Sequence, residues 1–165
     1  MIERYSRKEI RNIWQDYNKY SIWLEIELAA AEAMEKLKII PKGVVKAVRS
    51  KARININRIL QIENKVKHDI IAFLTSITEK AGKEARYLHK GMTWSDVLDT
   101  CFNLQLKQSG EILLKDINQL LQSIRKQAVK YKYTLCIGRS HGIHAEPITF
   151  GLKMLTCLLY TSPSP

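Results

Sequence analysis

The sequence predicts an all-α protein. Apolar residues recur at spacings of three and four along most of the chain, the pattern of amphipathic helices. We find no alternation of apolar and polar residues that favours a strand, no internal repeat and no glycine-rich phosphate loop. The longest helical pattern runs from about Trp94 to Tyr131, on the order of 55 Å at ~1.5 Å per residue. A helix of that length indicates a long bundle, completed by neighbouring chains.

Composition narrows the class of protein and of partner. The chain has 165 residues, 45% of them hydrophobic, which is enough for a core. Lysine and arginine exceed aspartate and glutamate by 27 − 16 = 11, which favours anionic partners. The lysines are spread out without an aromatic platform, which argues against a nucleic-acid surface. The three cysteines are far apart, as expected of reduced thiols in a cytosol. The sequence has no signal peptide, and no apolar run approaches the roughly 20 residues of a membrane span. These observations predict a soluble cytoplasmic protein without a membrane partner.

The first third of the chain predicts three helices. Ser6 to Glu9 form a capping-box pattern, which places a helix start at Ser6 and leaves Arg4 and Tyr5 just before it. The helical spacing then continues to Leu37, and Ile40 to Gly43 end the helix. A short helix follows from Val44, and Asn55 or Asn57 is expected to cap the next.

Two further helix starts carry polar side chains. Lys67, His68 and Asp69 precede an apolar pattern that runs to Gly82, with Asp69 expected as the N-cap. Three adjacent polar groups at a helix start suit an anionic ligand, although the residues alone favour the simpler interpretation of a cap beside a surface histidine. After a loop over residues 88–92, Thr93 to Asp96 give a second capping pattern.

Residues 138–151 separate two apolar helical patterns and are the strongest candidate for chemistry. Gly138, Gly142 and Pro147 exclude a continuous helix through the segment. A histidine titrates near neutrality, so His141 can donate or accept a proton, unless it is merely a surface residue in a turn.

His141 and His144 have a spacing known from zinc sites, but no cysteine or carboxylate pair accompanies them, so no metal ion is expected.

A new helix begins near Phe150 and is expected to stop after one or two turns. We regard residues 155–165 as an atypical tail, foreign to the protein or a sign of truncation.

Four segments together resemble the adenylosuccinate lyases of the fumarase/aspartase superfamily: residues 4–5, 67–73, 89–100 and 138–147. They occur in the order and spacing of that family, and the resemblance covers residues 1 to about 154. It implies an L-aspartase/fumarase-like fold with an N-terminal helical domain over residues 1–110 and the start of a central helical bundle over residues 111–154. It further implies a homotetramer whose active sites combine residues from three subunits.

The resemblance implies a β-elimination that breaks a C–N bond and releases fumarate from an anionic nucleotide, without metal or organic cofactor. His141 matches the general acid, and His68 reaches the same site from a neighbouring chain. The positions that match substrate-binding residues of the family are Arg4, Tyr5, Lys67, His68, Asp69, His89, Thr93, Ser95 and Ser140.

Two departures from the family bear on function. Trp94 stands where the family has the first serine of Thr-Ser-Ser-Asp, which removes a hydrogen bond to a carboxylate unless Ser95 or a backbone amide replaces it. The general base of the family is a serine beyond residue 165, so this polypeptide alone is expected to be inactive. The alternatives are another lyase or a cycloisomerase of the superfamily, or a non-catalytic basic helical binding module.

Overall fold

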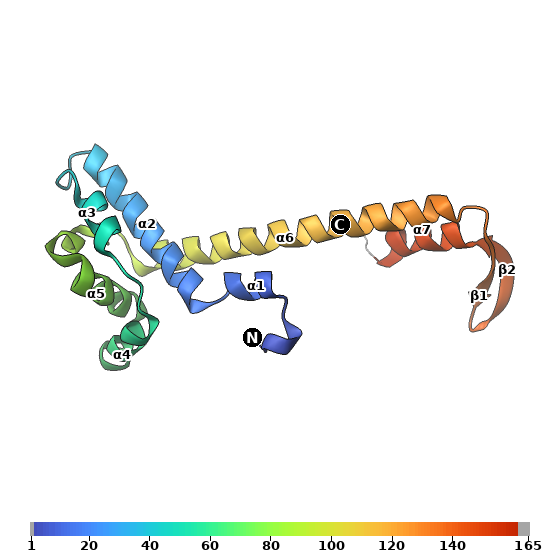
Figure 1. Cartoon of the computed structure of the whole chain (residues 1–165), viewed down its shortest axis with the longest axis horizontal. Helices are drawn as coiled ribbons and strands as arrows, with labels where there is room; N and C mark the ends of the chain where they lie inside the picture. The colour runs from blue at the N-terminus through green and yellow to red at the C-terminus, as the bar shows by residue number, and fades with distance from the viewer. Residues whose placement is uncertain (1, 162–165) are drawn as a thin grey trace. The chain divides into compact units, whose positions relative to one another are not determined.

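A computed structural model describes residues 2–161, and the chain there is almost entirely helical (Figure 1). Seven α-helices and two 3-10 segments lie in this range, together with one two-stranded sheet. The all-α prediction is confirmed. The chain divides into two compact units, Met1–Ser109 and Gly110–Pro165. Within residues 2–161, no helix has both the length and the apolar character required to cross a membrane.

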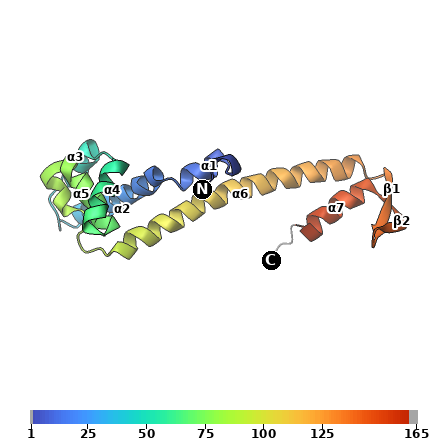
Figure 2. The same cartoon turned by 90° about the horizontal axis from the view of Figure 1, so that it is seen from below.

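The first unit is built from two 3-10 segments and six helices, the last of which continues into the second unit. In chain order these are η1 (Glu3–Tyr5), α1 (Lys8–Ile13), α2 (Asp16–Lys36), α3 (Val44–Lys51), α4 (Ile56–Val66), α5 (Asp69–Ala81), η2 (Gly82–Tyr87) and α6 (Trp94–Lys130). Helices α3, α4 and α5 gather beside α2 in both views (Figures 1 and 2).

An aromatic cluster joins α2 to α5. The rings of Tyr20 and Trp23 meet edge to face at 5.2 Å between centroids, and Phe73 lies 5.4 Å from Trp23 and stacks on Tyr20 at 5.8 Å. All three side chains are almost fully buried. Rings in these arrangements stabilise beyond the area they bury. The core continues through apolar residues of α3, α4, α5 and α6, among them Val48, Ile59, Ile77 and Val97.

The expected single helix from Ser6 to Leu37 is wrong, because the chain breaks between α1 and α2. The carbonyl oxygen of Ile13 accepts from the side-chain amides of Asn18, at 2.8 Å, and Gln105, at 2.7 Å. These two amides satisfy a carbonyl that a continuous helix would have bonded internally.

The Ser6 capping box is also wrong. Ser6 donates through both its amide and its hydroxyl to the carbonyl of Glu3, which closes η1. The carboxylate of Glu9 pairs with the guanidinium of Arg7 at 3.2 Å, so neither group of the expected box bonds to the other.

Helix caps at three other positions test the sequence predictions. Asn55 caps α4 by accepting from the amide of Arg58 at 3.0 Å, as expected. Thr93 donates its amide to the Asp96 carboxylate at 2.8 Å, which confirms one half of the second capping pattern. Asp69 is not an N-cap: His68 occupies that position, and Asp69 is the first residue of α5.

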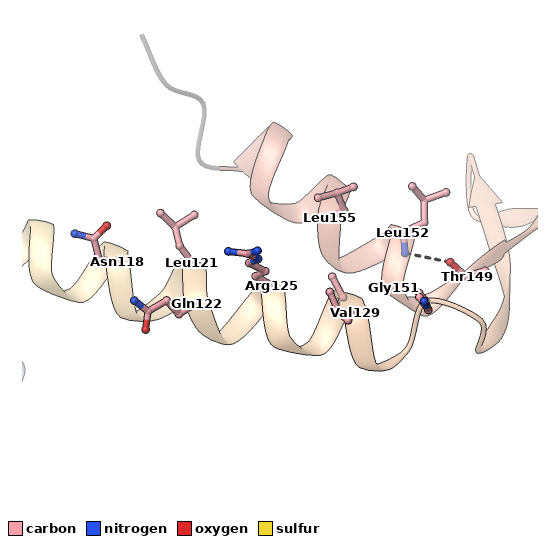
Figure 3. A pocket seen from close by; sticks show the side chains of 11 residues that line it. Asn118, Leu121, Gln122, Arg125, Val129, Thr149, Gly151, Leu152 and Leu155 are labelled. Carbon is pink, nitrogen blue, oxygen red and sulfur yellow. Dashed lines mark hydrogen bonds between the residues drawn. The ribbon is translucent and has the colours of Figure 1, made fainter.

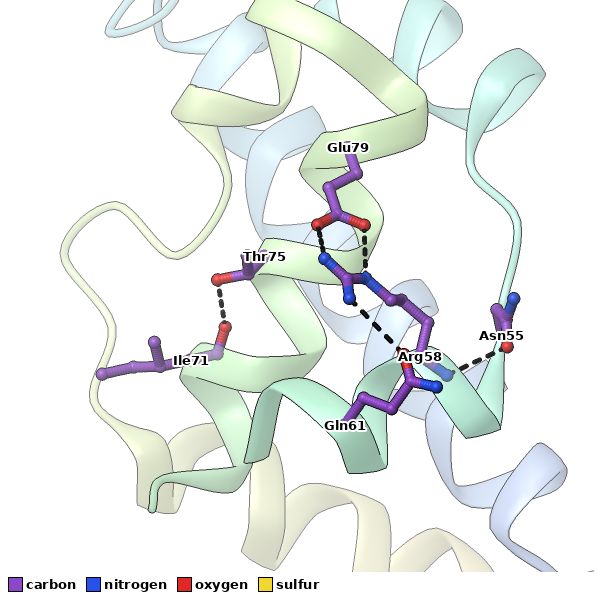
Figure 4. Close-up of polar contacts among 6 residues, drawn as sticks. All are labelled: Asn55, Arg58, Gln61, Ile71, Thr75 and Glu79. Carbon is purple, nitrogen blue, oxygen red and sulfur yellow. Dashed lines mark hydrogen bonds and ion pairs between the residues drawn. The ribbon is translucent and has the colours of Figure 1, made fainter. Parts of the chain in front are cut away.

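A salt bridge on the surface links α4 to α5. Arg58 holds both carboxylate oxygens of Glu79, at 2.9 and 2.6 Å, and also lies 3.5 Å from Gln61 (Figure 4). The Arg58–Glu79 salt bridge therefore links the same two helices, α4 and α5, that Lys67 and His68 connect. The hydrogen bonds to Arg58 lower the pKa of the Glu79 carboxyl.

Helix α6 runs unbroken through Gly110 for 37 residues, about 55 Å at a rise of 1.5 Å per residue. In the first unit it buries Val97, Cys101 and Gln105. Burial raises the pKa of the Cys101 thiol, which makes it a poor nucleophile.

The second unit contains a β-hairpin that the sequence analysis did not predict. Strands β1 (Leu135–Ser140) and β2 (Ile143–Thr149) pair antiparallel, and α7 (Phe150–Thr161) follows. The missed feature is the dipeptide His141-Gly142, whose residues both have positive φ, as a tight two-residue hairpin turn requires. Pro147 is tolerated because a two-stranded sheet consists only of edge strands.

Helix α7 is longer than expected. It has 12 residues and includes residues 155–161 of the expected tail, so the prediction that it stops after one or two turns is wrong. The remaining tail residues, 162–165, lie outside the described range.

Helices α6 and α7 approach closely at Gly151. A side chain at this position would place its Cβ 2.4 Å from the carbonyl oxygen of Ala128 and 2.7 Å from the Cα of Lys132. The amide of Gly151 donates to Tyr131 at 3.0 Å. Beyond this contact, α6 and α7 border an open groove of about 640 Å³ (Figure 3).

We expect Gly151→Ala to destabilise the second unit by about 1–3 kcal/mol, because the new methyl group meets backbone atoms that cannot move aside singly. The matched control is Gly110→Ala, where a Cβ has open space within α6 and should stabilise the helix by about 0.5–1 kcal/mol. Hydrogen exchange of the α7 amides measures the first effect, and exchange of the α6 amides around residue 110 measures the second. Unchanged exchange in the Gly151 variant would contradict the close approach.

We expect Glu79→Gln to make stability less dependent on pH. Because Arg58 lowers the folded-state pKa of Glu79, the carboxyl stabilises the fold above its ordinary pKa, and that contribution is lost as the pH falls through the folded value. Urea unfolding from neutral to acidic pH should therefore give a shallower decline in the variant. Arg58→Gln should have the same effect on the slope, and a wild-type slope in both variants would refute the prediction.

Candidate functional site

Three of the candidate residues have a left-handed backbone conformation, which residues other than glycine rarely adopt. Lys67, His89 and His141 have φ values of 56°, 59° and 51°, and the only other described non-glycine residue with positive φ is Lys38. This left-handed conformation costs a non-glycine residue roughly 1–2 kcal/mol. Such strain is concentrated at functional sites, so these chain reversals support the choice of segments made from the sequence.

His141 and Ser140 lie at the tip of the hairpin in the second unit. Ser140 pairs with Ile143, so His141 and Gly142 form the two-residue turn between them. Both Ser140 and His141 are exposed. A ring at the apex of a tight turn is open to a ligand, while the paired strands fix the position of its backbone.

Gly138 shapes the hairpin just before its tip. The strand register shifts between Ile137 and Arg139, and a Cβ at Gly138 would lie 2.7 Å from the carbonyl oxygen of Glu146. Only glycine permits this approach of the two strands. The irregularity therefore sets the direction of the last residues before His141.

Lys67 and His68 connect α4 to α5, and Asp69 is the first residue of α5. Lys67 ends α4 in the left-handed conformation, and its amide donates to Glu63 at 2.7 Å. His68 Nδ1 lies 3.5 Å from Asp69 Oδ1, and both side chains are partly exposed. Asp69 also accepts from the amide of Ile70 at 2.7 Å. The arrangement presents a cation, an imidazole and a carboxylate on consecutive residues.

His89 lies in the loop between η2 and α6 and is held by a residue from α2. Its amide lies 2.6 Å from Glu27 Oε2, and its ring Nδ1 lies 2.6 Å from Glu27 Oε1. Thr93 and Ser95 follow at the start of α6, where Thr93 is exposed and Ser95 is partly buried.

Arg4 and Tyr5 lie in η1, a short 3-10 turn. The Arg4 guanidinium lies 4.7 Å from the centre of the Tyr5 ring, a cation–π contact, and Tyr5 is 75% exposed. The expected position before a helix at Ser6 is corrected accordingly, since the following helix, α1, begins at Lys8.

The first unit does not join its candidate segments by direct bonds. Within the described part of the chain, no hydrogen bond or ion pair connects the Arg4–Tyr5, Lys67–Asp69 and Thr93–Ser95 segments to one another. Ser140 and His141 belong to the second unit. Among residues 2–161, no group of three or more histidine, cysteine, aspartate or glutamate side chains is arranged to hold a metal ion.

Glu27 is the residue that the sequence analysis missed. Its side chain is fully buried and both of its oxygens bond to His89. The available indication was its position on α2, four residues after Trp23 and therefore on the buried side of that helix. A carboxylate among core residues needs a partner, and the sequence alone does not say which.

Comparison with known proteins identifies the family. The family described as Lyase matches residues 3–161. Adenylosuccinate lyase of Bacillus subtilis (strain 168) is 48% identical over 154 residues, which cover 93% of this chain and 36% of that protein. The chain thus spans about a third of the length of this relative.

Solved structures support the same assignment. A fumarate lyase from Mesorhizobium sp. BNC1 matches with a TM-score of 0.85 and 26% identity, over 93% of this chain and 37% of that one. The β-carboxy-cis,cis-muconate cycloisomerase from Acinetobacter calcoaceticus sp. ADP1 matches with a TM-score of 0.82 and 25% identity, over 91% and 37%. The chain therefore belongs to the lyase family of the fumarase/aspartase superfamily and corresponds to its N-terminal part.

Proposed function

We propose that the full-length protein carrying this chain is a C–N lyase that releases fumarate from adenylosuccinate, giving AMP, and from the succinylated imidazole carboxamide ribotide of purine biosynthesis. The observation that carries the proposal is the 48% identity over 154 residues to a relative named adenylosuccinate lyase. The family match over residues 3–161 includes every candidate site residue. Because the chain spans 36% of that relative, the activity is proposed for the whole protein.

The elimination breaks a C–H bond beside a carboxylate and the C–N bond, and it forms the double bond of fumarate. One proton goes to a base and another must reach the departing nitrogen. His141 suits the second transfer because its ring is exposed at a fixed turn and an imidazole can both donate and accept a proton. In this proposal His141 is the general acid, and Ser140 supplies a hydroxyl beside it.

The remaining candidates suit an anionic substrate with one phosphate and two carboxylates. We assign Arg4 and Tyr5 to the phosphate, since a guanidinium and a hydroxyl both donate to its oxygens. Lys67, His68 and Asp69 form a second binding segment, with His68 completing the site of another subunit. The formal net charge of +11 favours encounter with such a substrate.

Thr93 and Ser95 are assigned to the succinyl carboxylate, with Trp94 between them. The Trp94 side chain is 55% exposed and supplies no hydroxyl. Helix α6 begins at Trp94, and the first amides of a helix have no partner within it. We therefore assign the hydrogen bond of the absent serine to Ser95 or to one of these amides.

Assembly into a cytoplasmic homotetramer is part of the proposal. Leu113, Ile117 and Leu121 of α6 are exposed in the single chain, although their spacing is that of a buried helix face. Helices of neighbouring subunits would cover them, with the bundle beginning near the boundary between the two units.

Another reaction of the same superfamily is the competing function. The similarity to a fumarate lyase and a muconate cycloisomerase favours it, at TM-scores of 0.85 and 0.82. Their identities of 26% and 25% are well below the 48% of the adenylosuccinate lyase. Comparing turnover of adenylosuccinate, argininosuccinate and a carboxymuconate by the full-length protein separates these possibilities.

In the full-length protein, His141→Ala should lower kcat by about 10²–10⁴-fold, the usual contribution of a positioned proton donor. His144→Ala is the matched control, since it removes an exposed imidazole from the same hairpin and should leave most activity. Fumarate release is followed by ultraviolet absorbance. Retention of activity in His141→Ala would refute its role as the general acid, and equal losses in both variants would indicate damage to the hairpin.

The purified 165-residue chain should release no fumarate from adenylosuccinate. The resemblance to the family implies a general base beyond residue 165. The 165-residue chain therefore has the expected proton donor, His141, without the base that removes the first proton. The full-length protein, assayed at the same concentration, is the positive control. Turnover by the 165-residue chain would overturn this assignment of the base.

A further inference from the structure

Glu27 is the one acidic or basic side chain that is buried among the described residues. The residue is 1% exposed, and the nearby core is formed by Trp23, Leu28 and Ala31 of the same helix. A carboxylate removed from water is costly unless hydrogen bonds and a partner compensate for the lost solvation. The contacts of Glu27 therefore matter more than those of the exposed carboxylates.

Both carboxylate oxygens of Glu27 bond to one residue, His89. His89 approaches Oε2 with its backbone amide and Oε1 with ring Nδ1, each at 2.6 Å. An ionised carboxylate only accepts hydrogen bonds, so with Glu27 ionised it is Nδ1 that carries the hydrogen in this contact. Two bonds from one carboxylate fix both the backbone and the ring of His89.

This contact determines which ring nitrogen is available to a ligand. With Nδ1 bonded to Glu27, Nε2 is the remaining nitrogen, and 23% of the His89 side chain is exposed. When the ring is protonated, Nε2–H can donate to an anionic oxygen. The bond made by one nitrogen thus sets the role of the other.

The backbone of His89 supports the same interpretation. It has φ of 59°, and the loop residues that follow, Lys90 to Met92, lead directly to Thr93 and Ser95. Such a conformation persists only where the surroundings impose it. The buried carboxylate supplies that constraint from α2, an element without any other candidate site residue.

We infer that Glu27 is a positioning residue of the lyase site, which holds His89 so that the Nε2–H of its protonated ring donates to an anionic oxygen of the substrate. The inference rests on the proposed function for the identity of the substrate. The Glu27–His89 pairing itself stands on the geometry of the first unit alone.

The first test compares steady-state kinetics of full-length variants. Glu27→Gln should lower kcat/KM by about 10–100-fold, by analogy with the loss when the carboxylate that orients a metal-ligating histidine is replaced. Glu35→Gln is the matched control: Glu35 lies on the same helix and accepts from the amide of Val45 at 2.7 Å, away from His89. It should change stability without lowering kcat/KM.

A double-mutant cycle separates positioning from general loss of structure. If Glu27 acts through His89, Glu27→Gln should cost little further activity in a His89→Gln background. Independent losses in the two backgrounds, or a wild-type kcat/KM for a folded Glu27→Gln variant, overturn the inference. Absence of turnover by the wild-type protein would instead refute the proposed function.

A measurement without any variant covers the case in which Glu27→Gln does not fold. Neutron diffraction of the full-length protein should place a deuterium on His89 Nδ1, facing Glu27. A deuterium on Glu27 Oε1, with Nδ1 as acceptor, overturns the inference. Both outcomes are independent of whether adenylosuccinate is the substrate.

Discussion

The packing of α2 against α5 is the interaction on which the candidate segments of the first unit depend. Trp23 meets Phe73 at 5.4 Å between ring centroids, and both are buried. Glu27 follows Trp23 by four residues, and Phe73 follows Asp69 by four, so each lies one helical turn from the aromatic contact. The same contact therefore fixes the carboxylate behind His89 and the start of α5. A core of this kind positions polar groups more precisely than surface loops do.

Three of the candidate residues share a second property, their place at reversals of the chain. Lys67 ends a helix, His89 occupies a loop and His141 forms a hairpin turn, each with positive φ. Glycine would adopt these conformations with less strain but would carry no functional group. The surrounding structure offsets the cost in different ways: Glu27 bonds to His89, whereas paired strands hold both sides of His141.

The periodicity of apolar residues was sufficient to predict most helices, but not the β-hairpin or the break before α2. The spacing of apolar residues predicted α3, α5 and the long α6, because these helices bury one face each. It missed the hairpin, where the turn residues His141 and Gly142 carried the information and the strand sequences show no clear alternation of apolar and polar residues. It also missed the break before α2, which depends on the Gln105 amide, 92 residues away from Ile13.

Helix α6 shows why a stripe of apolar residues does not by itself reveal what it packs against. In the first unit its residues at four-residue spacing, Val97, Cys101 and Gln105, are buried against the core. At the same spacing in the second unit, Leu113, Ile117 and Leu121 are 54%, 51% and 39% exposed. Exposed apolar surface of this extent is typical of an interface. Since helix propensity alone rarely stabilises so long a helix in water, burial of that second stripe is the contribution that the assembled bundle would supply.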